Sequence, residues 1–237
     1  MNLEKPNRLR LDPSSRLRDC RLGEIAVALP GATEIFRHFK FDFCCGGDQT
    51  LAEAAGARGV DLEVLEATLK ALDPADRPTV PLEPSALIDH ILARYHAVHR
   101  RELPELAKLA RKVEAVHRAH AEVPAGLAVA LEQMAEELES HMAKEEQVLF
   151  PLMRRGPHPM IGTPIAVMRS EHHEHGERLR DLDRLAHGMR LPADACTTWR
   201  ALYAGLGKLT DGLMEHIHLE NNLLFPQFAG SPTTNAA

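Results

Sequence analysis

Imidazole and carboxylate side chains recur at a fixed spacing in the second half of this 237-residue chain. The motif His-x-x-x-Glu recurs inside a longer repeat, at His141–Glu145 and His216–Glu220, and both positions of the motif are separated by 75 residues (216 − 141 = 220 − 145 = 75). One further histidine precedes each copy, His96 before the first and His172 before the second. These two histidines are 76 residues apart (172 − 96), nearly the same separation as that of the two copies. Imidazoles and carboxylates together suit iron or manganese better than a thiolate-rich zinc site. The six residues therefore predict a metal centre.

The length of the repeat distinguishes this pattern from an isolated His-x-x-x-Glu pair. Residues at i and i+4 share a helix face, so a single His-x-x-x-Glu pair usually indicates an ordinary surface contact. Here the whole segment 141–151 matches 216–226, and both copies end in Leu-Phe-Pro. The alternative is a buried polar network without metal. That alternative is disfavoured because burying four imidazoles and two carboxylates without a partner is costly.

Apolar residues at alternating steps of three and four predict the helices that position these ligands. In one such stripe Leu131, Met134 and Leu138 lead directly into His141 and Glu145. Four stripes of this kind lie within residues 85–228, which predicts an up-down four-helix bundle. In that topology the four histidines lie roughly 12–17 Å from the same end of the bundle, so the six residues converge at one level of the core. Two carboxylates facing each other there could bridge two ions.

The distribution of proline divides the chain into three regions. Residues 16–72 read as short helices, with Asp61 as the N-cap of one that ends near residue 72. Residues 73–84 contain four prolines and are predicted to form an extended linker. Residues 85–228 form the main domain, in which Pro104 predicts a kink or a break and Phe150-Pro151 a helix end. The fold class expected is all-α.

Composition excludes several classes of protein. The formal net charge is −6, and no basic patch indicates binding to nucleic acid. No run of about 18 apolar residues predicts a membrane span. No apolar segment near the N-terminus reads as a signal peptide, and the four cysteines do not form a disulfide framework in a chain of this length. A cytoplasmic protein is therefore expected.

With these residues in view, the chain resembles the RIC family of di-iron proteins that repair iron–sulfur clusters. The resemblance extends from Leu22 to Phe228. It rests on these segments: Ile88-Asp-His-Ile-Leu-Ala-Arg-Tyr-His96, Ser140-His-Met-Ala-Lys-Glu145-Glu, Leu149-Phe-Pro, Ser170-Glu-His172, Ala195-Cys-Thr-Thr-Trp199, Leu219-Glu-Asn-Asn and Asp42-Phe-Cys44-Cys45-Gly-Gly. It implies a hemerythrin-like bundle at 85–228 and a small helical ScdA-type domain at 16–72.

The resemblance also implies a cofactor and a function. The six residues would hold two non-haem irons (Fe²⁺/Fe³⁺) joined by an oxo or hydroxo bridge, with Glu145 and Glu220 bridging. The protein would restore clusters damaged by nitrosative or oxidative stress by donating iron, so its partners would be damaged iron–sulfur proteins and small ligands such as nitric oxide or oxygen. Two alternatives stay open: a nitric oxide reductase-type enzyme, and a nitric oxide or oxygen sensor. Whether the chain is an enzyme, or a homodimer, is also left open.

Further residues near the motifs have two interpretations each. His99 and His175 follow proposed ligands by three residues, and we expect them to support the ligands rather than to replace them. Glu137 and Glu171 would line a polar route or belong to a solvated face. Cys44 and Cys45 would form a thiol site for iron, nitric oxide or electrons, form a transient disulfide, or simply pack in a turn.

Overall fold

The computed structural model describes residues 16–72, 80–156 and 158–228. Within these ranges the chain is helical and contains no strand, which confirms the all-α expectation. It forms two compact units, residues 1–87 with 217–237 and residues 88–216. Residues 73–79 of the predicted linker lie outside the described residues, and the predicted domain limits stay a prediction. Over the described ranges, no helix is both long enough and apolar enough to cross a membrane.

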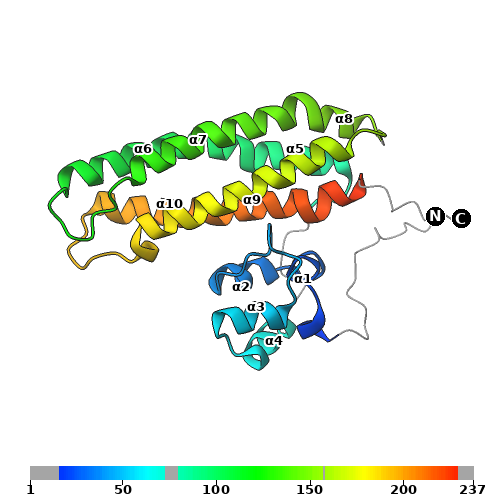
Figure 1. Cartoon of the computed structure of the whole chain (residues 1–237), viewed down its shortest axis with the longest axis horizontal. Helices are drawn as coiled ribbons and strands as arrows, with labels where there is room; N and C mark the ends of the chain where they lie inside the picture. Colours follow the sequence, from blue (N-terminus) through cyan, green and yellow to red (C-terminus); the bar gives the residue numbers. More distant parts are fainter. Residues whose placement is uncertain (1–15, 73–79, 157, 229–237) are drawn as a thin grey trace, which may run out of the picture. The chain divides into compact units, whose positions relative to one another are not determined.

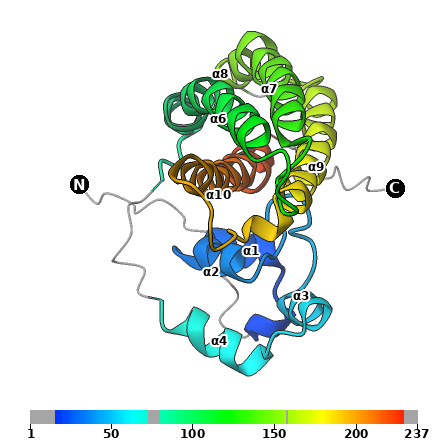
Figure 2. The same cartoon turned by 90° about the vertical axis from the view of Figure 1, so that its left-hand side faces the viewer.

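Four long helices, α6, α7, α9 and α10, run side by side as a bundle (Figures 1 and 2). Short π-helical segments extend three of the bundle's helices. In chain order the elements are α5 (Pro84–Ile91), the π segment η3 (Leu92–His96), α6 (Ala97–Val116), α7 (Leu127–Lys144), the π segment η4 (Glu145–Leu149), α8 (Phe150–Arg154), α9 (Gly162–Leu185), the 3₁₀ turn η5 (His187–Met189), α10 (Thr197–His218) and the π segment η6 (Leu219–Leu224).

The predicted apolar stripes form the core of the bundle. Leu131 and Leu138 of α7, Leu179 of α9, and Leu206 and Leu213 of α10 are all buried. Burial of these faces, rather than helix propensity alone, stabilises helices of this length. The seam positions predicted from the sequence therefore face inward, and the polar residues that continue the seams are carried inward with them.

Proline interrupts the helical path at neither of two positions where the sequence predicts an interruption. Helix α6 runs through Pro104 without a break. Its buried face, which includes Leu103 and Leu106, packs in the core. The free energy gained by this burial offsets the loss of the one hydrogen bond that a proline nitrogen cannot donate. The helical path also continues past Phe150 to Arg154. Pro151 lies in the first turn of α8, where the missing N–H is tolerated.

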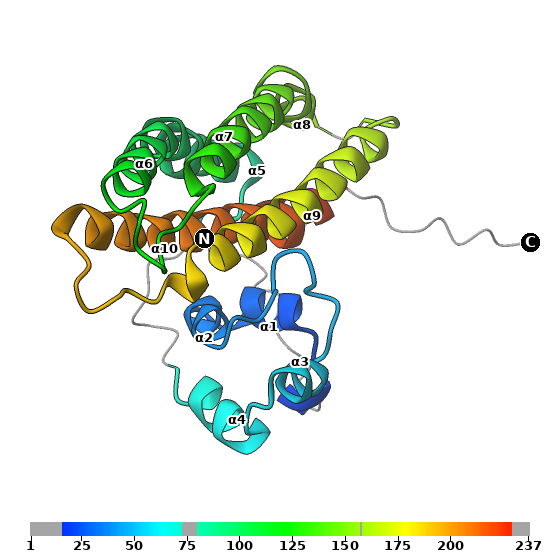
Figure 3. The same cartoon turned by 60° about the vertical axis from the view of Figure 1, so that its left-hand side comes forward.

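The N-terminal residues form short helices, drawn in blue to cyan in Figure 3. They are the 3₁₀ turn η1 (Leu17–Asp19), α1 (Leu22–Ala28), α2 (Ala32–His38), α3 (Leu51–Arg58) and α4 (Leu62–Lys70); the 3₁₀ turn η7 (Phe225–Gln227) belongs to the same unit. Asp61 caps α4 as predicted, by accepting hydrogen bonds from the backbone N–H groups of Glu63 and Val64. The rings of Phe36 and Phe43 pack 5.9 Å apart in the core of this region.

Candidate metal centre

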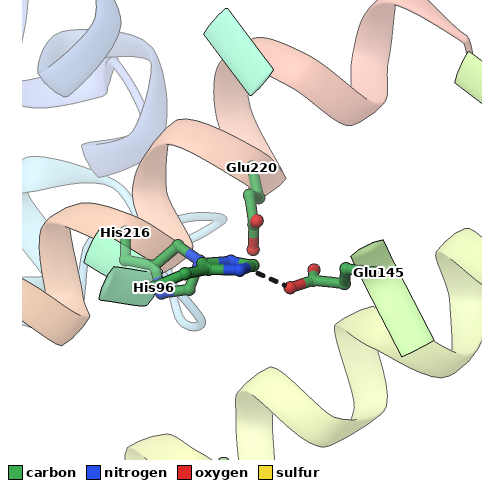
Figure 4. A group of neighbouring side chains, drawn as sticks. All are labelled: His96, Glu145, His216 and Glu220. Carbon is green, nitrogen blue, oxygen red and sulfur yellow. Dashed lines mark hydrogen bonds and ion pairs between the residues drawn. The ribbon is translucent and has the colours of Figure 1, made fainter. Parts of the chain in front are cut away.

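The structure brings all six predicted ligands together in two overlapping groups. In each group, one ligand atom from every residue lies within 4.8 Å of the others. One group is His96, Glu145, His216 and Glu220, and the other is His141, Glu145, His172 and Glu220. The two glutamates thus belong to both groups, whereas each histidine belongs to one. Figure 4 shows the four side chains of the first group converging on one another.

Helical geometry explains how these side chains meet. His141, His172 and His216 lie on α7, α9 and α10, while the other three lie on π-helical segments. His96 ends η3, Glu145 begins η4, and Glu220 follows His216 by four residues on a continuous helix. A π turn shifts the following side chains around the helix axis, and such turns are frequent at functional sites. Every π segment among the described residues carries one of the six.

The six side chains are withdrawn from solvent, and none is more than 1 % exposed. The Nε2 atoms of His96 and His216 lie 3.1 Å apart, as do those of His141 and His172. Glu145 faces both pairs, with one carboxylate oxygen 3.4 Å from His96 Nε2 and the other 3.4 Å from His141 Nε2. One nitrogen of each imidazole pair therefore lies close to the same carboxylate.

These distances fit a metal ion. Two nitrogens that each lie about 2.1 Å from one ion, at a right angle, are about 3.0 Å apart. The observed 3.1 Å matches such an edge in both imidazole pairs. A cation between the nitrogens and the carboxylates would also offset the cost of burying two acidic groups. The donor set is one that accepts a divalent or trivalent first-row metal.

Two further carboxylates fix the orientation of the imidazoles. Glu146 Oε1 lies 2.8 Å from His96 Nδ1, and Glu171 Oε2 lies 2.8 Å from His141 Nδ1. A proton on Nδ1 is then shared with the carboxylate, and the lone pair of Nε2 points into the group, as metal ligation requires. Arg100 bonds Glu146 at 2.7 Å, and Lys144 bonds Glu171 at 2.5 Å.

The charges of these supporting carboxylates are stabilised. Burial by itself raises the pKa of Glu146, but hydrogen bonds from Arg100 and His96 outweigh it, so the pKa lies below its ordinary value. Burial likewise raises the pKa of Glu171, and hydrogen bonds from Lys144 and His141 lower it by more. Both carboxylates are therefore ionised at neutral pH and act as acceptors for the histidine N–H groups.

Comparison with known proteins agrees with this geometry. The model of the hemerythrin HHE cation-binding domain matches residues 87–228, and that of the ScdA N-terminal domain, a domain of unknown function, matches residues 18–73. The chain is 47 % identical over 213 residues to the iron–sulfur cluster repair protein YtfE of Musicola paradisiaca, with 89 % of this chain and 96 % of the relative covered. It is 48 % identical over 216 residues, with the same shares covered, to the proteins of that name from Escherichia coli O157:H7 and Shigella boydii serotype 4.

The chain belongs to the YtfE family. The resemblance inferred from the motifs is confirmed, and so is the hemerythrin-like class of the bundle. In this YtfE-family protein the residues matched by the hemerythrin model include all six members of the two groups. The cation-binding description of that model agrees with a metal site in the bundle.

The other predicted site residues lie near the groups but outside them. The ring of His99 lies 5.5 Å from that of His216, and the ring of His175 lies 5.0 Å from that of His141. Burial lowers the pKa of His175 to about 3, so its ring is neutral at neutral pH. Glu137 instead pairs with Arg178 at 2.8 Å near the surface. Support of the ligands by His99 and His175 stays a prediction.

The sequence pattern does not single out Glu146, which contacts His96 directly. Two signals pointed toward it. It follows Glu145 immediately, and Arg100 lies four residues after His96, on the same face of its helix. Neither Glu146 nor Arg100 continues an apolar seam, so periodicity alone places both on a solvated surface.

Proposed function

We propose that this protein holds two irons and restores damaged iron–sulfur clusters by donating iron. The observation that carries the proposal is the sharing of Glu145 and Glu220 by two otherwise separate groups of histidines. Two ion positions with common carboxylates are what this sharing suggests. The name printed for the relatives, iron–sulfur cluster repair protein, supports the biological role.

The ligand roles follow from membership of the groups. His96 and His216 would hold one iron, His141 and His172 the other, and the two glutamates would bridge them. Six protein ligands for two irons leave coordination positions for an oxo or hydroxo bridge and for small ligands such as nitric oxide or oxygen. We extend the proposal to damaged iron–sulfur proteins as clients and to a cytoplasmic location.

The charges of the donor set favour release of iron as a cargo. Four of the six donors are neutral imidazoles, so the two glutamates supply the only formal negative charge within the groups. Ferrous ions are attracted to those carboxylates less strongly than ferric ions, because the attraction scales with the charge of the ion. Reduction should therefore loosen the iron, whereas a carrier of oxygen has to retain its metal in every state.

The first experiment tests the ligands. We expect about two irons per chain in protein purified without added metal, measured by elemental analysis. Glu145→Gln and Glu220→Gln keep the shape of the side chain but remove a negative charge, so each should lower the iron content. His99→Gln is the matched control, since His99 is equally buried but lies outside both groups. A greater loss in the control, or stoichiometric zinc in place of iron, would contradict the assignment.

The second experiment tests donation. The reduced and the oxidised protein are each mixed with a chelator of comparable strength for the iron present, or with an apo form of a cluster protein. Faster transfer from the reduced protein supports iron donation. Equally slow release from both states would contradict it, because a repair protein of this kind has to part with its metal.

A further inference from the structure

A second cluster of metal-binding side chains lies in the loop between α2 and α3. Ligand atoms of Asp42, Cys44 and Cys45 lie within 4.8 Å of one another. None of the three belongs to the histidine–glutamate groups. We propose that Asp42, Cys44 and Cys45 form a separate metal site for a thiophilic divalent ion such as Zn²⁺ or Fe²⁺. The inference does not depend on the proposed function.

The distances within the loop match the edges of a tetrahedral site. The Sγ atoms of Cys44 and Cys45 lie 3.7 Å apart. A disulfide bond would need about 2.05 Å, whereas two thiolates at about 2.3 Å from a tetrahedral ion lie about 3.8 Å apart. Cys44 Sγ is 3.6 Å from Asp42 Oδ1. A thiolate and a carboxylate oxygen on such an ion lie about 3.5 Å apart, so both edges fit the same centre.

The loop is held in this form by its backbone. Asp42 Oδ1 accepts hydrogen bonds from the N–H groups of Cys45 at 2.9 Å and Gly46 at 3.0 Å, which orients the carboxylate. Gly47 approaches so closely that a Cβ atom there would lie 2.6 Å from the carbonyl oxygen of Phe43. Only glycine fits this approach without a shift of the backbone. An ion would therefore enter a loop that is already ordered, and little conformational entropy would be lost on binding.

The loop is also tied to the segment that carries Glu220. The side-chain amide of Asn221 donates a 2.9 Å hydrogen bond to the carbonyl oxygen of Cys44, and that of Asn222 donates one of 3.4 Å to Phe43. These bonds anchor the loop on both sides of the Phe43–Cys44 peptide. The backbone that carries the two cysteines is thus held by hydrogen bonds that do not involve their thiols.

The two thiols differ in their exposure to solvent. Binding of an ion would release their protons, since the thiolate is the form that ligates a metal. Cys44 is 5 % exposed, whereas Cys45 is half-buried, so an ion can reach the site past Cys45. Three protein ligands leave a fourth position for water or an outside donor.

Cobalt is the probe that separates the two metal sites. Full-length protein with iron in its histidine–glutamate groups, freed of any further iron and kept reduced without oxygen, is titrated with Co²⁺. A thiolate ligand gives a near-ultraviolet charge-transfer band that imidazole and carboxylate ligands do not give, so cobalt in the histidine–glutamate groups does not contribute. We expect about one equivalent of Co²⁺ with this band and with the visible bands of tetrahedral cobalt, and Zn²⁺ should displace it.

The variants test each ligand. Cys45→Ser should abolish the band. Asp42→Asn retains the oxygen that accepts from Cys45 and Gly46 but removes the charge, and it should raise the Co²⁺ dissociation constant by about tenfold or more, since even indirect supports of a metal site contribute that much. Circular dichroism and the iron content of each variant verify that the fold and the other centre persist.

Two other cysteines provide the controls. Cys20→Ser removes a buried thiol outside the cluster. Cys196→Ser removes a half-buried thiol whose pKa is lowered to about 7 by hydrogen bonds from the backbone of Trp199 and from His117, which makes it the better adventitious ligand. Both should keep the band. Absence of the band in the unaltered protein, its persistence in Cys45→Ser, or its loss in Cys196→Ser would overturn the proposal.

Discussion

The two halves of the repeat place equivalent residues in different surroundings. Glu146 and Asn221 each follow a shared glutamate, and they are related by the same offset as the glutamates themselves (221 − 146 = 220 − 145). Glu146 turns to the metal centre, where it lies 2.8 Å from His96 Nδ1. Asn221 instead bonds the backbone of Cys44. The two halves thus share the proposed ligands, whereas the residues that follow the shared glutamates make different contacts.

A second equivalent pair differs in the same way. Glu171 and Tyr95 each immediately precede a lone histidine of the repeat, so they occupy matching positions in the two halves. Glu171 bonds His141 Nδ1, whereas the ring of Tyr95 stacks on that of His216, with centroids 5.6 Å apart and planes 10° from parallel. The imidazole of His141 is therefore held by a charged carboxylate, and that of His216 by an aromatic ring. In this chain, therefore, the two halves keep the same proposed ligands but support them in different ways.

Among the side chains that support the proposed ligands, removal of the Glu146 carboxylate should have the largest effect on iron binding. Glu146→Ala leaves the Nδ1–H of His96 without its acceptor, which lowers the basicity of Nε2 and frees the ring to turn. Loss of such a support raises the metal dissociation constant by about 10- to 100-fold. Competition for iron with a chelator of known affinity measures this change.

Glu139→Ala is the matched control for that experiment. Glu139 bonds the same guanidinium of Arg100, but it is not among the partners of His96. It should leave iron affinity within about twofold, since an exposed ion pair contributes little. Equal losses in the two variants would show that Arg100, and not the contact between Glu146 and His96, supports the centre.

Asn221→Ala should loosen the cysteine loop more than it weakens iron binding. The carbonyl oxygen of Cys44 would lose its amide donor in a buried position, which costs about 1–3 kcal/mol. Hydrogen exchange of the amides of residues 42–47 should accelerate accordingly. Gln227→Ala removes an exposed amide that also donates to backbone carbonyls, and it should leave this exchange unchanged. If Asn221→Ala costs as much iron affinity as Glu146→Ala, the difference between the halves is not real.

The sequence predicted most of what depends on periodicity. The stripe from Leu131 to Glu145 faces the core, and the six residues meet at one level, because helix repeats and bundle topology determine which side chains converge. The contact of Glu146 with His96 was not predictable in this way, since it depends on which way the Nδ1 edge of a ring points after the helices pack. The π segments were also missed, because a single inserted residue barely alters the spacing of a seam. The break considered at Pro104 does not occur, because packing of the helix in the core outweighs the local preference of proline.

Of the changes to side chains that contact a proposed ligand, Tyr95→Leu should have the smallest effect on iron binding, and it tests the comparison most directly. A stacked ring limits the rotation of His216 but does not accept a proton from it, so it changes the nitrogen's basicity very little. Aromatic pairs contribute about 0.5–1.5 kcal/mol beyond burial, and most of that is present with or without metal. The iron dissociation constant should therefore rise by less than about threefold. Glu171→Gln, which removes the charge beside His141, should raise it by about tenfold. Competition with a chelator measures the iron dissociation constant of both variants. Equal increases would contradict the comparison, because they would mean that a stacked ring holds a ligand as firmly as a carboxylate does.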